Sequence, residues 1–188
     1  MARWEPGTKE RLQATALELF GEHGFDETTV AQIAARAEVT ERTFYRYFAD
    51  KREVLFDGQH HFEQAFLDGV GGAPDDATPT ELSAAALHSA SGFFGEERRA
   101  WARARQEVIA TDAGLREREL LKLAHLSGLL TTALRERGIP DPRAGLVADS
   151  TLSVFHVAFQ QWIVTAETRT FPELVEDTLA HLRALALG

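Results

Sequence analysis

The chain has 188 residues, enough to bury a substantial core in one domain or in two small ones. It contains no cysteine, which excludes disulfides, thiolate chemistry and cysteine-ligated zinc. The net charge of −9 is unusual for a protein that binds nucleic acid, and neither a signal core nor a membrane span is visible, so we expect a cytoplasmic protein without a membrane partner.

A first helix is expected over residues 8–23, where Leu12, Ala16, Leu19 and Phe20 share one stripe. The glycine that follows, residue 24, suits the left-handed position at which helices commonly end. The next residue, Phe25, can then fold back as the accompanying hydrophobic contact.

A second, short helix is indicated by Val30, Ile33, Ala34 and Ala37, which fall on one helical face. Thr28 or Thr29 can cap its start, because a threonine oxygen can accept a hydrogen bond from a free amide of the first turn. Glu38 and Val39 then form a turn, and Thr40 caps the helix that follows.

The third helix, residues 41–48, has two chemically different faces. A rotation of about 100° per residue puts Phe44 and Phe48 on one side and places the cations on the other. Guanidinium groups read guanine edges in the DNA major groove, and hydroxyl groups reach phosphates. We therefore predict a DNA-reading helix whose outward residues are Arg42, Thr43, Arg46 and the flanking Tyr45 and Tyr47.

Asp50 is expected to cap a connecting helix over residues 51–69, with Lys51 in its first turn beside the phosphates. Glycines 69, 71 and 72 with Pro74 and Pro79 predict a loop after it. Every later segment has helical periodicity. The expected ranges are about 80–94, 97–110, 113–137 and 141–165, and a last helix that Pro172 opens.

The run ALELFGEHGFDETTVAQIAARAEVTERTFYRYFADKREVL closely resembles the DNA-binding domain of TetR-type transcriptional regulators. The shared motifs are Gly-Phe after the first helix, T-V-x-x-I-A, and T-F-Y-x-Y-F-x-x-K. The resemblance covers roughly the first third of the chain. It departs at Glu38, where the family usually has glycine, and a left-handed residue there would cost about 1 to 2 kcal/mol.

The resemblance implies an all-α protein with two domains. Residues 1–50 form a three-helix, helix-turn-helix DNA-binding domain. Residues 51–188, including the connecting helix 51–69, form a helical ligand-binding and dimerisation domain in which the final two long helices pair with their mates. A single recognition helix also reads too few base pairs, so we expect a homodimer on an operator of double-stranded DNA.

The candidate DNA contacts are set against a simpler interpretation, a solvated helix face. Arg42 and Arg46 are the candidates for base edges, and Gln32 can reach either a base or a phosphate. In the arm before the first helix, Arg3 could follow a groove or be a solvated tail residue. The full set is Thr29, Gln32, Arg42, Thr43, Tyr45, Arg46, Tyr47 and Lys51.

Aromatic residues in the C-terminal domain are core residues first, but together they can line an apolar cavity for a small-molecule effector. Histidine and glutamine side chains nearby could orient such a ligand. The candidates are Phe62, Phe66, Phe93, Trp101, Gln106, His125, Phe155, Phe159 and Trp162. No sequence motif indicates a metal, another cofactor or a catalytic site.

Two functions remain open from the sequence. The first is a ligand-responsive transcriptional regulator, most often a repressor in this family and not an enzyme, in which an effector shifts the connecting helix and releases DNA. The second is a helical small-molecule carrier or enzyme whose N-terminal unit only supports the fold.

Overall fold

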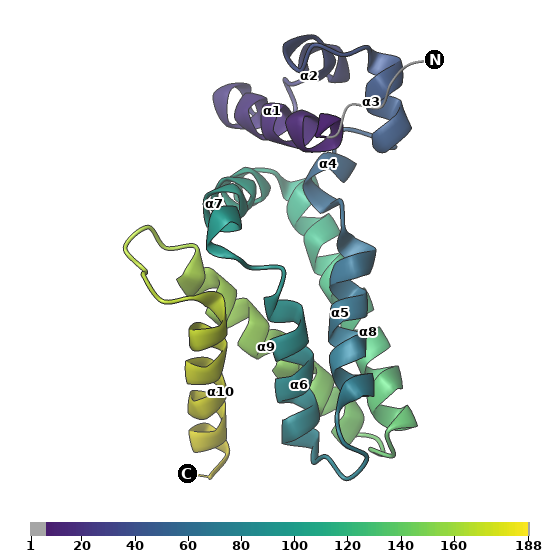
Figure 1. Cartoon of the computed structure of the whole chain (residues 1–188), viewed down its shortest axis with the longest axis vertical. Coiled ribbons are helices and arrows are strands. Elements are labelled where there is room, and N and C mark those ends of the chain that lie inside the picture. Colours follow the sequence, from purple (N-terminus) through teal and green to yellow (C-terminus); the bar gives the residue numbers. More distant parts are fainter. Residues whose placement is uncertain (1–6, 188) are drawn as a thin grey trace. The chain divides into compact units, whose positions relative to one another are not determined.

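The computed structural model describes residues 7–187, so Arg3 lies outside the described residues. The described part of the chain is entirely helical, as predicted, and contains ten helices (Figure 1). These are α1 (Thr8–His23), α2 (Val30–Arg36), α3 (Glu41–Tyr47), α4 (Glu53–Phe56), α5 (Gln59–Gly72), α6 (Pro79–Ser91), α7 (Glu96–Thr111), α8 (Ala113–Glu136), α9 (Arg143–Trp162) and α10 (Phe171–Leu187).

The chain divides into two compact units. The N-terminal unit extends to Gly58 and also includes Trp101–Glu117, a stretch that no sequence pattern linked to the first helices. The C-terminal unit comprises Gln59–Ala100 and the chain from Arg118 onward. The helices α7 and α8 therefore each contribute residues to both units.

Helix α1 ends at the predicted position. Gly24 has a positive φ of 85°, but its ψ of 159° is extended and not that of the expected left-handed helical conformation; its amide donates to the Phe20 carbonyl at 3.0 Å. Phe25 is buried and its ring centroid lies 5.1 Å from that of Phe20. Glycine adopts this backbone conformation without the steric cost that a Cβ would bring, so α1 stops where the sequence predicts.

The two threonines before α2 have different roles. Thr29 is the cap: its hydroxyl accepts from the Gln32 amide at 3.2 Å, and Gln32 Oε1 accepts from the Thr29 amide at 2.7 Å. Thr28 is buried, and its hydroxyl donates to the carbonyls of Gly24 at 2.8 Å and Leu19 at 3.2 Å. Thr28 thus fixes the loop after α1, while Thr29 starts α2.

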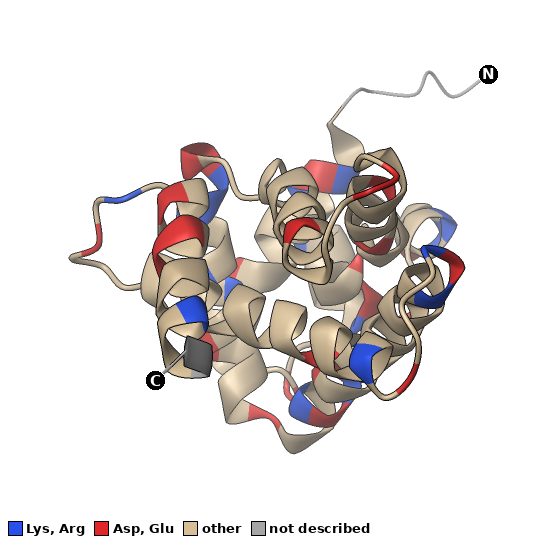
Figure 2. Ribbon diagram, turned by 90° about the horizontal axis from the view of Figure 1, so that it is seen from below, with Lys and Arg blue, Asp and Glu red and all other residues tan. Residues whose placement is uncertain are grey.

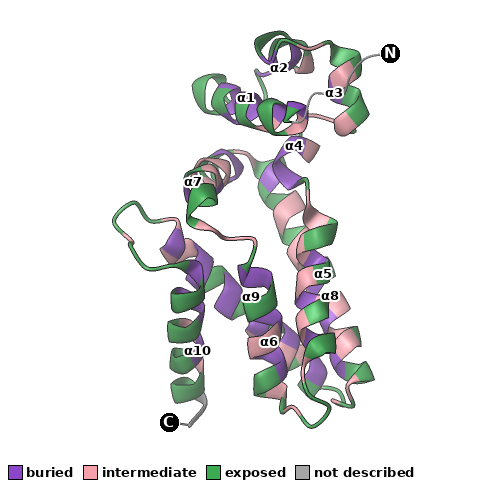
Figure 3. Ribbon diagram, viewed as in Figure 1, coloured by how far each residue is buried: buried purple, intermediate pink, exposed green. Residues whose placement is uncertain are grey.

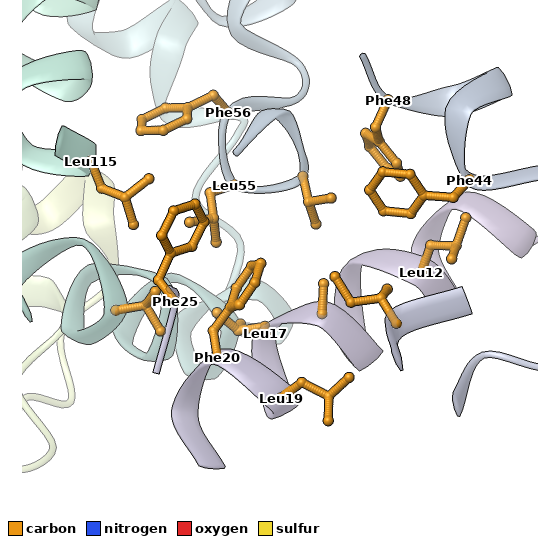
Figure 4. Packing of buried hydrophobic residues seen from close by; sticks show 14 of the residues in the cluster. Leu12, Leu17, Leu19, Phe20, Phe25, Phe44, Phe48, Leu55, Phe56 and Leu115 are labelled. Atoms are coloured by element: carbon orange, nitrogen blue, oxygen red, sulfur yellow. The ribbon is translucent and has the colours of Figure 1, made fainter. Parts of the chain in front are cut away.

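The core of the N-terminal unit draws on residues far apart in the sequence. Phe44 and Phe48 from α3 pack near Leu12 of α1, and Leu115 lies in the same cluster (Figure 4). Val108 and Ile109 of α7 also belong to it, and Ile109 is fully buried. Helices α1, α2 and α3 therefore bury part of their apolar surface against residues that lie more than fifty positions later in the sequence.

The expected connecting helix 51–69 is not continuous. Asp50 does cap its first turn, with Oδ1 accepting from the Glu53 amide at 3.0 Å, but α4 ends at Phe56. Gly58 has a positive φ of 83°, and α5 begins at Gln59. The break is anchored from two sides, because Asp57 pairs with Lys9 of α1 at 2.8 Å and Arg105 of α7 donates to the Leu55 carbonyl at 2.6 Å.

The glycines expected to form a loop after residue 69 instead lie inside α5. At Gly69 the helix passes so close to α6 that an added Cβ would collide with the Ala85 carbonyl and would lie 2.6 Å from the Ala86 Cα. Helices α5 and α6 lie side by side along their length (Figure 1). Gly69 thus permits close helix packing, a role that local sequence signals do not distinguish from turn formation.

Helix α10 packs one side against α9 and leaves the other exposed (Figure 3). Leu174, Val175 and Leu179 of α10 are buried, whereas Leu185 near its end is exposed. The loop before α10 is held by the buried guanidinium of Arg99, which donates to the carbonyls of Glu167 and Arg169.

The helix-turn-helix turn contains a left-handed residue that is not glycine. Glu38 has φ of 56°, its amide donates to the Ala35 carbonyl, and the next amide, of Val39, donates to the Ala34 carbonyl at 2.9 Å. The turn thus keeps its geometry and hydrogen bonds despite the Cβ of Glu38. The expected strain is present, because a side chain is disfavoured at this φ.

We predict that replacing Gly69 with alanine destabilises the C-terminal unit by about 1–3 kcal/mol, the usual cost of overpacking. The matched control is Gly71→Ala in the same helix, where an added Cβ meets nothing within 4 Å. Because alanine is the better helix former, that variant should gain up to about 1 kcal/mol. Urea unfolding of both full-length variants checks this, and equal effects would contradict close packing at Gly69.

We further predict that Glu38→Gly raises the free energy of unfolding by about 1 kcal/mol, because glycine relieves the left-handed strain. Glu38→Gln removes the charge but keeps the Cβ, so it should leave stability unchanged. Thermal and urea unfolding compare the two variants. Equal stabilisation by glutamine would attribute the cost to the carboxylate and not to the backbone.

Candidate nucleic-acid interface

Helix α3 presents its polar face to solvent because its apolar face is held in the core. Phe44 and Phe48 are almost completely buried, with ring centroids 5.4 Å apart. The Thr40 hydroxyl caps the helix by accepting from the Thr43 amide at 3.1 Å. The cap and the two phenylalanines therefore fix both where α3 begins and which way it faces.

The outward residues of α3 surround a shallow hollow. It has a volume of about 660 Å³ and is lined by residues that were predicted to read DNA, together with the capping threonine. Arg42, Tyr45 and Arg46 are exposed, and Thr43 and Tyr47 are half-buried. The structure thus gathers on one helix face the guanidinium and hydroxyl groups that DNA edges and phosphates can bind.

The two arginines of this face have different surroundings. Arg46 lies over the Tyr47 ring, 5.0 Å from its centroid, and its Nη2 donates to the Tyr47 hydroxyl at 3.3 Å. Arg42 forms no ion pair with any residue in the described part of the chain. The stacking restrains the Arg46 guanidinium, and the hydrogen bond to Tyr47 uses only one of its five N–H donors.

Thr29 and Gln32 reach the predicted interface from the start of α2. Their capping box uses the Thr29 hydroxyl and Gln32 Oε1, which also accepts from that hydroxyl at 3.0 Å. Both residues remain exposed or nearly so at the helix start. For contact with DNA, Gln32 therefore offers its Nε2 amide as a donor while its oxygen is engaged in the cap.

Lys51 does not extend from the fold as the sequence led us to expect. Its ammonium donates to three backbone carbonyls, those of Phe25 at 2.6 Å, Thr28 at 3.0 Å and Asp26 at 3.1 Å. It also lies 4.3 Å from the centroid of the Phe25 ring. We expected this side chain to lie beside DNA phosphates. That expectation took no account of the three carbonyl acceptors, which belong to a loop 23 to 26 residues earlier in the sequence.

Positive charge near this surface is scarce. Figure 2 shows acidic and basic residues intermingled over the molecule. Arg36 is engaged with Glu22 at 3.0 Å, and Arg52 with Asp50 at 2.8 Å. Burial raises the pKa of the Asp50 carboxyl, but hydrogen bonds from the Arg52 side chain and from the Glu53 and Arg52 amides outweigh this and leave that pKa below its ordinary value. Asp50 is thus ionised at neutral pH.

In the C-terminal unit, most of the aromatic residues that were predicted to line the ligand site pack against one another. Phe62 and Phe66 of α5 lie 5.3 Å and 5.8 Å from Phe155 of α9, measured between ring centroids. These distances are typical of packed aromatic pairs. The predicted members of this aromatic cluster are Phe62, Phe66, Phe93, Phe155, Phe159 and Trp162.

Two further rings complete the aromatic cluster. Phe94, in the α6–α7 loop, lies 4.4 Å from Phe171 and 5.6 Å from Trp162. Phe171 begins α10 and is fully buried. Phe171 was not among the aromatic residues expected to line the cavity. An apolar residue directly before Pro172 at a helix start was the available signal for Phe171.

Three candidate ligand residues do not join the aromatic cluster. Trp101 packs against the core of the N-terminal unit, and Gln106 lies in the part of α7 that belongs to that unit. His125 is exposed on α8. Trp101 and Gln106 therefore do not join the predicted ligand site, because this stretch of α7 packs with the first helices, which position in the later part of the sequence did not reveal.

A second surface hollow, of about 730 Å³, lies at the ends of α5 and α6 and is lined by small and acidic residues, among them Asp68, Asp76 and Glu81. No cluster of three metal-ligating side chains occurs among the described residues. Of the helices the structure describes, none is long and apolar enough to cross a membrane.

Comparison with known proteins agrees with this geometry. Residues 12–57 match the model of bacterial regulatory proteins of the tetR family. The HTH-type transcriptional regulator TcmR of Streptomyces glaucescens is 28% identical over 170 residues, which cover 86% of this chain and 75% of that protein. The similarity thus extends beyond the helix-turn-helix into the C-terminal unit.

Solved structures share the fold at lower sequence identity. A putative TetR-family transcriptional regulator from Syntrophomonas wolfei aligns with a TM-score of 0.65 at 20% identity, covering 96% of this chain and 95% of that one. FadR of Thermus thermophilus, a TetR-family repressor in complex with lauroyl-CoA, aligns with a TM-score of 0.52 at 22% identity, covering 93% of each chain. Residues 12–57 are thus a DNA-binding domain of the tetR family, and the chain as a whole is similar in sequence to an HTH-type transcriptional regulator and in fold to TetR-family regulators.

Proposed function

We propose that the protein is a repressor that binds a two-fold-related operator as a homodimer in the cytoplasm and releases it when a small molecule enters the C-terminal unit. The observation that carries the DNA-binding part is the exposed face of α3, where Arg42 and Arg46 stand beside Thr43 and Tyr45 over buried phenylalanines. Guanidinium pairs to guanine edges would supply sequence discrimination, and the hydroxyls would hold phosphates.

Two features support a dimer: the short length of the DNA-reading helix α3 and the exposed apolar side chains of α8 and α9. One seven-residue helix spans too few base pairs, and two of them about 34–36 Å apart would enter successive major grooves. In α9, Leu146 and Val157 are 64% and 43% exposed and lie eleven residues apart, on one helical face. Leu120 and Leu121 of α8 are more than 60% exposed. A second copy of the chain would cover such residues.

For the effector we propose an apolar molecule that separates the rings of the aromatic cluster. The rings of Phe94, Phe155 and Phe159 already fill the space between them, so a ligand must displace aromatic contacts and replace their burial with its own. FadR of Thermus thermophilus, which shares the fold, was solved with lauroyl-CoA, a ligand that carries a long apolar chain. Acyl and aromatic molecules are therefore the classes to screen.

The coupling between effector and DNA would be a two-state shift. Helices α7 and α8 each contribute residues to both units, and the break at Gly58 joins α4 to α5. Displacing the aromatic cluster would move these links and change the separation of the two α3 helices in the dimer. A coupling free energy of about 1–3 kcal/mol would weaken operator binding roughly 5- to 150-fold. Thermal stabilisation by a small molecule without a change in operator affinity would contradict this coupling.

The alternative function is a helical small-molecule carrier or enzyme. It requires that the outward arginines of α3 do not bind DNA. We predict that Arg46→Glu lowers operator affinity at least about thirtyfold, since each arginine–guanine pair is worth about 1–3 kcal/mol and a dimer loses two. The melting temperature should stay the same, because Arg46 is exposed. Selection of genomic fragments at low salt supplies the operator, and fluorescence anisotropy measures its affinity.

Arg98→Glu on α7 is the matched control, since it makes the same charge change at another exposed arginine, on a helix that is not proposed to pair in the dimer. It should retain operator affinity. If both variants bind equally well, or if the unaltered protein enriches no two-fold-related site even at low salt, the alternative function gains support.

We predict that Leu146→Asp combined with Val157→Asp converts the dimer to a monomer of 20.8 kDa and abolishes cooperative operator binding. Both side chains are exposed in the single chain, so the helical circular dichroism should not change. Analytical ultracentrifugation at micromolar concentration measures the mass. The control carries acids at two exposed polar positions, Gln64→Asp with Ser89→Asp, and should remain dimeric. A monomeric unaltered protein would contradict the proposal.

A further inference from the structure

The ammonium group of Lys51 has its hydrogen-bonding capacity filled from inside the protein. An ammonium has three donors, and the carbonyls of Phe25, Asp26 and Thr28 supply three acceptors at 2.6 to 3.1 Å. The face of the Phe25 ring lies beneath it at 4.3 Å, and that ring is itself buried against Phe20. A phosphate oxygen could bind this group only by displacing one of these carbonyls.

The three carbonyls belong to one short segment, the loop between Gly24 and Thr29 that joins α1 to α2. The same loop is held from its other side by Thr28, whose buried hydroxyl donates to the carbonyls of Leu19 and Gly24. Backbone carbonyls in a loop have no helical partner and otherwise bind water. Lys51 and Thr28 together therefore determine the path of the chain into the first residue of α2.

The position of this loop matters for the DNA-reading surface. Its last residue, Thr29, forms the capping box with Gln32, and both are predicted DNA contacts. Lys51 lies just before α4, so it ties the residues after α3 to the residues before α2. One side chain thus links the two ends of the helix-turn-helix.

We infer that Lys51 is a positioning residue, not a phosphate ligand, and that it supports operator binding by holding the α1–α2 loop so that Thr29 and Gln32 can face DNA. This inference rests on the proposed DNA-binding function of the same surface. It changes the role of Lys51, which the sequence analysis placed among the contacts to DNA phosphates. The two roles differ in a quantity that can be measured, the dependence of operator affinity on salt.

Lys51→Met keeps most of the aliphatic stem and removes the ammonium. We expect roughly a tenfold loss of operator affinity, which corresponds to about 1.4 kcal/mol. The slope of log affinity against log salt should stay unchanged, because no phosphate contact is lost. A phosphate ligand would instead reduce the slope by about 0.9 for each contact, and so by about 1.8 for a dimer. Hydrogen exchange should show faster exchange of the backbone amides of residues 24–32.

Two further variants make the result decisive. Arg52→Met removes a neighbouring charge whose guanidinium is bound to Asp50, so it controls for a general loss of positive potential and should leave exchange at residues 24–32 unchanged. Lys51→Arg keeps the charge, but a planar guanidinium cannot reproduce the arrangement of three donors around one nitrogen, so we expect no rescue. Full rescue by arginine, or a reduced salt slope in Lys51→Met, would overturn the inference.

The test separates this inference from the proposed function. If the unaltered protein binds no operator, the proposed function fails, and the exchange of residues 24–32 in Lys51→Met still decides whether Lys51 anchors the loop. If the unaltered protein binds and the Lys51→Met variant exchanges and binds as the unaltered protein does, only the positioning role fails.

Discussion

The DNA-reading head depends on apolar burial that its own three helices cannot supply. Helices α2 and α3 have seven residues each and present few large side chains, so a core made from α1–α3 alone would be thin. The structure adds Leu55 and Phe56 of α4, Ile109 of α7 and Leu115 of α8 to the same cluster. The exposed arginine face exists because this extended core holds Phe44 and Phe48 inward.

Many Arg and Lys side chains of this acidic protein donate hydrogen bonds to its own backbone carbonyls. Arg105 donates to a carbonyl of α4 just before the α4–α5 break. Arg137 donates to the carbonyls of Val70 in the last turn of α5 and of Pro74 after it, and Arg99 donates to the loop before α10. Lys51 does the same for the α1–α2 loop. A charged donor strengthens such hydrogen bonds. Each loop held in this way leaves one fewer cation for phosphates, so operator affinity should depend on a small number of side chains and on both subunits.

The two proposed binding surfaces differ in how complete they are in this conformation. The face of α3 is open and its polar groups are already gathered around a hollow. The aromatic cluster is packed, with Phe94 in contact with both Phe171 and Trp162. In the proposed function, DNA would bind to the face of α3 as it stands, whereas an effector would have to separate the rings. Such a difference suits a two-state regulator.

The sequence by itself determined the features that arise within a turn or two of helix. Helical periodicity and the capping residues predicted the bounds of α1, a threonine cap at residue 28 or 29, the Thr40 cap and the two faces of α3, because these depend on neighbours three or four residues away. The family resemblance singled out Glu38, where a glycine is usual, and its backbone is left-handed in the structure.

Only the tertiary structure decided which distant groups meet. It placed Trp101 with the first helices, Gly69 against the backbone of α6, and the ammonium of Lys51 among carbonyls 23 to 26 residues away. None of these contacts leaves a local periodicity in the sequence. A glycine that permits close packing and a glycine that makes a turn look the same in the sequence, as do a lysine that binds phosphate and a lysine that binds its own fold, because the partner that distinguishes them lies far along the chain.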